Sequence, residues 1–155
     1  MDFLKRIFYP DQSVRNSVAL LLLRFVAGIA FILHGADKMK NPTGWMGPAS
    51  TMPGFLQTMA ALAEFGGGIA WLLGGLFPLF TLLIGCTMIV ATQTQMGKGL
   101  PFVAAGGLSY EAALGYLAIS ILFLMMGPGE FAVDTFLLKQ FRRNHVSKPL
   151  SSKET

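Results

Sequence analysis

Charged side chains are scarce in this sequence. Asp, Glu, Lys and Arg together make up 13% of its 155 residues, whereas a soluble domain usually carries about 25%. The charges that are present gather at the two ends and in two connecting stretches, which is typical of an integral membrane protein. The net charge is +4. Because no run of Lys and Arg alternates with aromatic residues, we do not expect a nucleic-acid partner.

Cysteine is nearly absent. The single residue, Cys86, lies inside an apolar run, so we expect no internal disulfide, no two-thiol relay and no cysteine-ligated iron–sulfur cluster. Haem is not expected either, because His34 is the one histidine close to an apolar run and His145 lies in a polar tail. Spacings typical of metal ligands, of a nucleophile elbow or of a phosphate-binding loop are also missing, and we predict no metal site.

Long apolar runs are what the sequence has instead. A membrane-spanning helix needs about 20 mostly apolar residues, and four stretches approach or reach that length: 17–34, 55–77, 79–94 and 110–126. Pro78 separates the second stretch from the third, which predicts a tight antiparallel hairpin. The sequence therefore predicts an all-α fold built as a four-helix transmembrane bundle.

A shorter amphipathic pattern follows the fourth run. Between residues 131 and 141, Phe and Leu fall roughly on one side and basic residues gather near the end, which predicts a helix in the membrane interface. We divide the chain into an N-terminal segment (1–16), a membrane domain with its interfacial helix (17–141) and a polar tail (142–155), which we expect to be disordered from Asn144 onward. No small-residue cleavage site closes the first run, so we expect an uncleaved signal-anchor.

The basic residues predict the orientation of the chain. Most Lys and Arg residues lie in the two terminal segments, while the loop after the first run holds Lys38 and Lys40 and the loop after the third holds only Lys98. Four spans place both termini on one side of the membrane, and that side is the more basic one. The positive-inside rule therefore predicts that both termini are cytoplasmic.

Two ionisable residues lie within the apolar runs. Arg24 is about two turns into the first run from the cytoplasmic side, and Glu64 is two to three turns into the second from the outer side. At a rise of about 1.5 Å per residue, both depths fall near the middle of a core about 30 Å thick. We predict that Arg24 and Glu64 form a buried ion pair, which either fixes the helix packing or lines a polar cavity.

Polar residues also gather at the outer ends of the runs. His34 and Lys38 are four residues apart and therefore neighbours on a helix, and Glu111 begins the fourth run. His34 suits proton transfer because its ordinary pKa lies near neutrality. The group could bind a carbonyl and relay a proton, or it could only cap helix ends and reach toward water. The remaining members of this outer group are Asp37, Gln93, Gln95 and Tyr110.

Three motifs resemble those of the DoxX family of small bacterial membrane proteins. The likeness extends from about Leu20 to Asp134. Together and in order, on four spans, the motifs make the resemblance fairly specific. They are Arg24-Phe25, Gly28, Phe31, His34-Gly35 and Lys38 in the first run; Glu64-Phe65-Gly66-Gly67-Gly68 with Leu73-Gly74-Gly75 in the second; and Tyr110-Glu111 with Gly127-Pro128-Gly129-Glu130-Phe131-Ala132-Val133-Asp134 at the end. At Ala132 the closing motif departs from the serine usual in the family.

The resemblance implies a four-helix bundle in the bacterial inner membrane. It also implies similarity to subunits of quinone-linked oxidoreductases, including thiosulfate:quinone oxidoreductase. On this reading a quinone is the expected cofactor, and the chain either acts with a protein partner or forms a homo-oligomer. The candidate catalytic residues are His34, Lys38 and Glu111. The candidate cofactor-binding residues are Arg24, Glu64, Phe31 and Trp71, with Phe31 and Trp71 flanking the ring.

Other functions remain open at this stage. The chain has no electron carrier of its own, so electrons must come from a partner or directly from a substrate. It could instead be a non-catalytic adaptor that anchors soluble redox enzymes through its short turn and basic C-terminal helix. A proton-coupled transporter is a further alternative, although four spans without an inverted repeat argue against a self-contained carrier.

Overall fold

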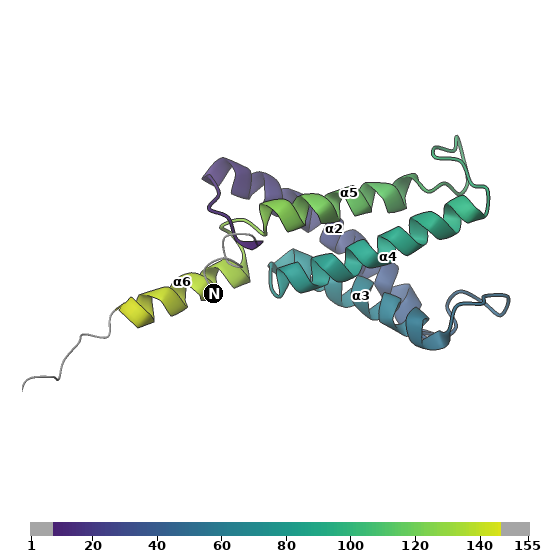
Figure 1. The fold of residues 1–155 in the computed structure, drawn as a ribbon, viewed down its shortest axis with the longest axis horizontal. Helices are drawn as coiled ribbons and strands as arrows, with labels where there is room; N and C mark the ends of the chain where they lie inside the picture. The colour runs from purple at the N-terminus through teal and green to yellow at the C-terminus, as the bar shows by residue number, and fades with distance from the viewer. Residues whose placement is uncertain (1–7, 147–155) are drawn as a thin grey trace, which may run out of the picture.

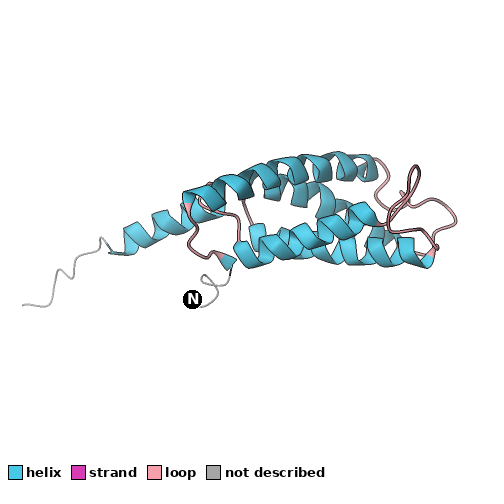
Figure 2. Cartoon of the chain, turned by 90° about the horizontal axis from the view of Figure 1, so that it is seen from above, coloured by secondary structure: helices cyan, strands magenta, loops and turns pink. Residues whose placement is uncertain are grey.

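Residues 8–146 are described by the computed structural model. They form five helices and no strand (Figures 1 and 2): α2 (Val14–Met39), α3 (Gly54–Leu73), α4 (Phe77–Gly97), α5 (Glu111–Met126) and α6 (Val133–Val146). The prediction of an all-α fold is confirmed. The disorder expected from Asn144 onward is wrong for residues 144–146, which belong to α6; residues 147–155 lie outside the described range.

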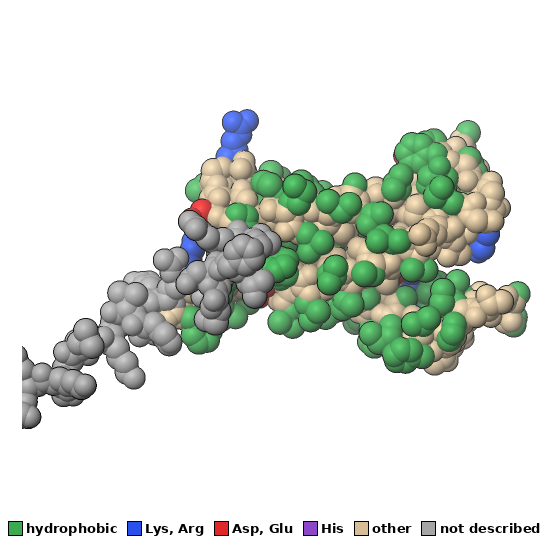
Figure 3. Space-filling view, in the orientation of Figure 1, with side chains coloured by type: hydrophobic (Ala, Val, Ile, Leu, Met, Phe, Trp, Pro, Cys, Tyr) green, Lys and Arg blue, Asp and Glu red, His purple; other side chains and the backbone are tan. Residues whose placement is uncertain are grey.

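Four of the helices, α2 to α5, run alongside one another, and α6 extends away from them at one end (Figure 1). Within the described range, α2, α3 and α4 are long and apolar enough to cross a membrane, while α5 is apolar but has 16 residues. Large apolar side chains such as Leu22, Phe25 and Val26 are more than half exposed. Figure 3 shows such side chains spread over the visible face, with Lys and Arg only near its ends. Lipid is the environment that suits this surface.

Glycine brings α2 and α3 into close contact. A Cβ added to Gly28 would lie 2.9 Å from the carbonyl oxygen of Gly68, and one added to Gly68 would lie 2.6 Å from the backbone nitrogen of Ile32. Gly35 likewise meets the backbone of Phe65. Small residues at these positions let the two backbones approach, as is common between helices in membranes. Gly28 and Gly35 of the first motif and Gly68 of the second therefore lie in the α2–α3 contact.

Edge-to-face aromatic pairs fill the centre of the bundle. The ring of Trp71 lies 5.2 Å from that of Phe31 and 4.9 Å from that of Phe123. Tyr116 of α5 packs against Phe31 at 4.8 Å. Trp71 is fully buried, and its Nε1 donates to Thr81 Oγ1 at 2.9 Å, so its polar atom is satisfied as a buried indole requires. The aromatic core therefore joins α2, α3, α4 and α5.

The predicted Arg24–Glu64 ion pair is wrong. Arg24 is 1% exposed, and its Nε and Nη2 donate to the carbonyl oxygens of Trp71 and Leu72 at 2.7 and 3.1 Å. Its Nη1 donates to the carbonyl oxygens of Pro128 and Phe131 at 2.9 and 3.1 Å. The prediction failed because it used the depth of each residue along its own helix and did not know the register between α2 and α3. Gly28 faces Gly68, so Arg24 lies opposite the last turn of α3, where carbonyl groups lack helical partners.

Asp134 completes the same end of the bundle. Its two carboxylate oxygens accept from the backbone nitrogens of Leu76 and Phe77 at 2.9 and 2.8 Å. A side chain in the first turn of α6 therefore caps the start of α4. Tyr9 donates its hydroxyl to the same carboxylate at 2.8 Å. Leu76 has a φ of 48°, a left-handed conformation that these bonds help to hold. The closing motif therefore supplies carbonyl groups to Arg24 and a carboxylate to α4.

Candidate functional site

A cavity of about 450 Å³ lies at the end of the bundle opposite Arg24. Helices α3 and α4 are in close contact where Gly67 meets Ile84, and they separate from there toward the loops (Figure 1). Figure 3 shows the surface hollowed at this end, between the α2–α3 loop and the end of α4. The cavity is lined by Lys38, Trp45, Met46, Met52, Leu56, Gln57, Met59, Ala60, Ala63, Glu64, Leu83, Cys86, Thr87, Val90, Ala91, Thr94, Gln95 and Lys98.

One ion pair lies in the wall of this cavity. Lys38 Nζ is 2.5 Å from Glu64 Oε1 and 2.6 Å from Oε2. The Glu64 side chain is 5% exposed and the Lys38 side chain 23%. Lys38 belongs to the last turn of α2, where a cation is favoured by the helix dipole. Because the two charges compensate each other, the carboxylate can stay buried in an apolar wall.

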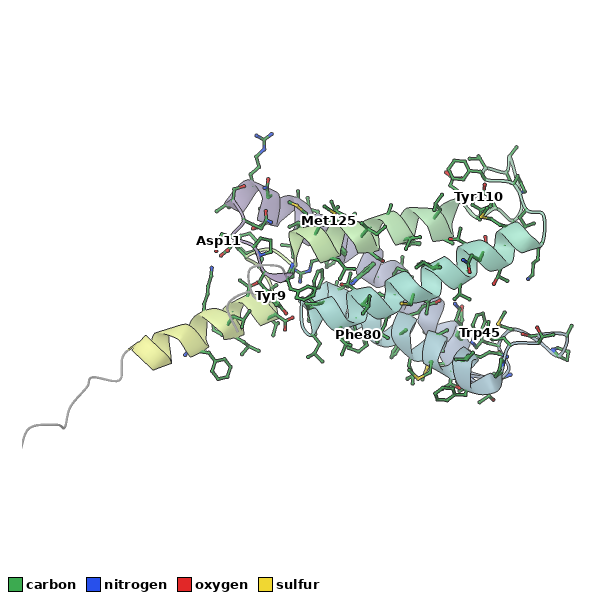
Figure 4. The ribbon with its side chains drawn as sticks, viewed as in Figure 1. Tyr9, Asp11, Trp45, Phe80, Tyr110 and Met125 are labelled. Atoms are coloured by element: carbon green, nitrogen blue, oxygen red, sulfur yellow. The ribbon has the colours of Figure 1, made fainter. Side chains whose placement is uncertain are left out.

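Trp45 covers the ammonium group from the loop side. Its ring centroid lies 4.2 Å from Lys38 Nζ, a geometry in which the cation is attracted to the face of the ring. Figure 4 shows Trp45 in the loop at this end of the molecule and Tyr9 near the start of α6 at the opposite end. Lys38 therefore contacts a carboxylate and an aromatic face at once.

Gln57 fixes the α2–α3 loop over the cavity. The residue is 4% exposed, its Oε1 accepts from the backbone nitrogen of Met46 at 3.1 Å, and its Nε2 donates to the carbonyl oxygen of Met52 at 2.8 Å. Its own carbonyl oxygen accepts from Trp45 Nε1 at 3.0 Å. One buried side chain thus joins both arms of the loop and positions the tryptophan that covers Lys38.

Sequence reasoning did not single out Gln57. A signal was available, because Gln57 precedes Glu64 by seven residues and two helical turns place both on one face. Nor did the sequence predict that Trp45, in the loop between the first two apolar runs, contacts Lys38. The contact with Lys38 depends on how the loop folds back, and no helical periodicity reports that path.

The sequence-predicted site residues fall into three places. Lys38 and Glu64 are brought together in the cavity wall. His34 and Glu111 are exposed, and within residues 8–146 no hydrogen bond or ion pair joins either one to Lys38 or to the other. Phe31 and Trp71 lie in the aromatic core, and neither lines the cavity. Arg24 lies at the opposite end of the bundle. The proposed chemical roles of His34 and Glu111 remain predictions.

The rest of the wall combines apolar residues with a few polar ones. Leu56 and Val90, both nearly half exposed, are among the apolar residues that line the cavity. Thr94 and Gln95 supply polar atoms from the last turns of α4. In the described part of the chain, no cluster of three His, Cys, Asp or Glu side chains could hold a metal ion.

Comparisons with known proteins extend over most of the chain. A model of the DoxX family matches residues 19–97. Inner membrane protein YqjF of Escherichia coli (strain K12) is 33% identical over 137 residues, which cover 81% of this chain and 97% of the relative. The protein of Bacillus subtilis (strain 168) named "Putative oxidoreductase CatD" is 29% identical over 133 residues, which cover 84% of this chain and 95% of the relative. No solved structure matches the chain.

Proposed function

The chain belongs to the DoxX family of membrane proteins, and we propose that it binds a quinone, or another small redox-active molecule, in the cavity beside Lys38 and Glu64. On this proposal it is the membrane subunit of a quinone-linked oxidoreductase. The observation that carries the proposal is a largely buried ion pair in the wall of an otherwise mainly apolar cavity.

The residues present fit such a ligand. A volume of about 450 Å³ lies within the range of about 300–1,000 Å³ that is usual for small-molecule sites, and those sites are mostly apolar with a few placed polar groups. A quinone has the same character, because a flat apolar ring carries carbonyl groups at its edge. The face of Trp45 and the side chains of Met46, Met52 and Met59 offer surfaces for the ring.

Lys38 and Glu64 give the cavity its chemistry. A bound quinone would supply two-electron chemistry coupled to protons. An ammonium group has three N–H donors, and Lys38 directs bonds to both oxygens of Glu64, which leaves a donor for a ligand carbonyl oxygen. The Glu64 carboxylate can accept a proton from a ligand hydroxyl, and the neighbouring ammonium stabilises the charge that remains when that proton leaves again.

The membrane arrangement follows from the surface of the helices. Helix α5 would be the fourth span, because it packs against α4 and exposes Ile121, Leu122 and Met125. Helix α6 would lie in the interface, since Phe136 and Phe141 are 66% and 64% exposed. By the positive-inside rule, both termini would be cytoplasmic. The relative named as an inner membrane protein supports the bacterial inner membrane as the location.

A protein partner would complete the electron path. The chain holds one cysteine and no predicted metal or haem ligands, so electrons would reach the bound molecule from another subunit or directly from a substrate. The word oxidoreductase in the name of the Bacillus subtilis relative supports redox chemistry. A second copy of the chain is the other candidate for the partner.

Tryptophan fluorescence with a short-chain quinone tests the proposal. The chain has two tryptophans: Trp45 lines the cavity and Trp71 is in the core. In purified Trp71→Phe protein, the titration should quench Trp45 with saturation. Quenching of Trp71 in Trp45→Phe protein should be weaker. Lys38→Met and Glu64→Gln should weaken binding by about tenfold or more, since each removes a charge-assisted hydrogen bond.

Two controls make the test specific. Lys40→Met removes a lysine that is two residues from Lys38 and has a side chain 78% exposed, so it should leave the titration unchanged. Quinone that merely partitions into detergent would quench all variants alike. Equal binding by wild type, Lys38→Met and Glu64→Gln would contradict the proposal. An adaptor function would then be favoured, to be tested by co-purification from native membranes.

A further inference from the structure

The loop between α4 and α5 exposes its large apolar side chains. Phe102 is 51% exposed, Val103 58% and Leu108 76%. No Asp, Glu, Lys or Arg occurs between Gly99 and Tyr110. Figure 3 shows apolar side chains gathered over this loop, at the end of the molecule opposite α6. Single apolar residues on a surface are ordinary, but an uncharged segment that exposes several of them indicates contact with a partner or a membrane.

The α2–α3 loop, at the same end of the bundle, uses its apolar residues differently. Its large side chains Trp45, Met46 and Met52 line the cavity and are only partly exposed. Its exposed positions include polar residues such as Thr43. In the α4–α5 loop, by contrast, no residue from 99 to 109 lines the cavity. The apolar side chains of the α4–α5 loop therefore face outward.

Helix α5 is too short to cross the hydrocarbon core by itself. Its 16 residues extend about 24 Å at a rise of about 1.5 Å per residue, whereas the core is about 30 Å thick. Helix α4 has 21 residues, or about 32 Å, and it extends past the start of α5 (Figure 1). The chain must therefore return from the end of α4 to the recessed start of α5, so part of the loop lies at a depth that the membrane still covers.

We propose that the α4–α5 loop (residues 99–110) is inserted in the headgroup region of the bilayer, on the side of the membrane opposite the termini. This inference rests on the proposed placement of α5 as the fourth span and not on the identity of the ligand. Phe102, Val103 and Leu108 reach the edge of the hydrocarbon core. The apolar surface of the helices continues onto the loop through Met96, which is 53% exposed at the end of α4. In the headgroup region, water can satisfy the polar groups of an irregular backbone.

The composition of the loop favours a lipid surface over a protein partner. The ring of Phe102 lies 5.5 Å from that of Tyr110, and tyrosine is enriched where a span meets the membrane surface. Interfaces between proteins usually have a polar rim, whereas between residues 99 and 109 only Ser109 has a polar side chain. Lys98 precedes the loop and also lines the cavity. Insertion of the loop therefore places one edge of the proposed ligand site at the level of the lipid headgroups.

Spin labels on single cysteines test the position of the loop in full-length protein reconstituted in vesicles of phosphatidylethanolamine and phosphatidylglycerol. Cys86 is the only cysteine, so Cys86→Ala provides the background. Collisions of the label with oxygen, which concentrates in hydrocarbon, are compared with its collisions with a water-soluble nickel chelate. The oxygen-to-nickel ratio at Val103→Cys should be several-fold higher than at Ala49→Cys, an exposed position in the α2–α3 loop. It should not exceed the ratio at Ile121→Cys, which gives the value for an exposed side chain of α5.

Leu108→Ser provides a second readout in the same Val103→Cys background. Because Leu108 is 76% exposed, the substitution should leave the melting temperature in detergent unchanged. In vesicles it should lower the oxygen-to-nickel ratio toward the value at Ala49, since the loop loses apolar surface. Ala105→Ser, at another exposed position of the loop, removes less apolar surface and should leave the ratio unchanged.

Three outcomes would overturn the inference. A ratio at Val103 equal to that at Ala49 would place the loop in water. Few collisions with either reagent would show that a second copy of the chain, or another protein, covers the loop. A water-like ratio at Ile121 would also remove α5 as a span. Each of these outcomes is distinguishable from a failure of the quinone site beside Lys38 and Glu64, which the fluorescence titration measures separately.

Discussion

The ammonium nitrogen of Lys38 lies within 2.6 Å of both carboxylate oxygens of Glu64, and this contact ties the last turn of α2 to the middle of α3. Glu64 is almost fully buried, so removing its partner leaves an uncompensated charge. We expect Lys38→Met to lower the free energy of unfolding by about 3 kcal/mol. Denaturation in mild detergent, followed by circular dichroism, measures the change.

The double variant separates pairing from other effects. Replacing both residues by apolar ones, as Lys38→Met with Glu64→Leu, removes the unpaired charge and should recover most of the lost stability. The exposed Lys40→Met variant again serves as the control, with a change below about 0.5 kcal/mol. A double variant no more stable than Lys38→Met alone would count against the pair as the cause.

Arg24 should be sensitive even to a change that keeps its charge. Its guanidinium donates to four carbonyl oxygens, two in the last turn of α3 and two in the segment before α6. Lysine has a single nitrogen and cannot reach all four in that geometry. We therefore expect Arg24→Lys to destabilise the fold by about 2–4 kcal/mol.

Differential scanning fluorimetry of Arg24→Lys beside Arg15→Lys tests this expectation. Arg15 is exposed near the start of α2, so its replacement should change little. Arg24→Lys should also loosen the chain locally. Proteolysis within the 127–132 segment should become faster, because the carbonyl groups of Pro128 and Phe131 lose their hydrogen bonds to Arg24. Comparable melting temperatures for the two variants would mean that the four bonds contribute little.

The sequence was a better guide to which polar residues are buried than to which groups they bind. Arg24 and Glu64 were both placed in the interior, and both are buried. Their pairing was inferred from depth along each helix, but depth depends on where the helices begin and on their relative register. The register is determined by the glycine contact of Gly28 with Gly68, and helical periodicity alone does not specify which glycine meets which.

The path of the α2–α3 loop was the other feature that the sequence did not predict. The pattern of apolar runs located α2 to α5 to within several residues, because about 20 apolar residues in a row have few alternatives to a helix. The path of residues 40–53 depends on the hydrogen bonds of one glutamine, Gln57, and on a cation–aromatic contact at Trp45. Each of these interactions joins residues of the loop to a helix, so no local sequence rule reports them.

Tyr9 should titrate at higher pH than an ordinary tyrosine. Burial, together with the hydrogen bond and the negative charge of Asp134, raises its pKa above the usual 10.0. The folded state thus favours the protonated phenol. Its contribution to stability is fully present below pH 10 and is lost as the pH rises through the folded-state pKa.

Ultraviolet absorbance of phenolate across an alkaline titration measures this effect. Tyr9→Phe should remove the step at highest pH, while Tyr110→Phe should retain it, because the two tyrosines lie at opposite ends of the molecule (Figure 4). Asp134→Asn should move the Tyr9 step to lower pH by removing the negative charge. A titration of Tyr9→Phe with an unchanged final step would contradict the assignment.

Gln57 should control the loop that covers the cavity. We expect Gln57→Leu to release both arms of the loop, because the bonds to Met46 and Met52 are lost together and leucine offers no replacement. In a Trp71→Phe background the emission then comes from Trp45 alone, and it should shift to the red as the indole becomes more exposed. Trypsin should also cleave after Lys40 several-fold faster than in the parent protein.

Lys98 provides an internal control for the proteolysis experiment. Lys98 follows α4 in a separate loop that Gln57 does not contact, so cleavage after Lys98 should proceed at the parental rate. A rise at both sites would indicate general unfolding of the variant. Because the released loop no longer holds Trp45 over Lys38, Gln57→Leu should also weaken binding of the short-chain quinone while leaving the Lys38–Glu64 pair in place. Unchanged emission and an unchanged rate at Lys40 would show that the loop is held by contacts other than Gln57.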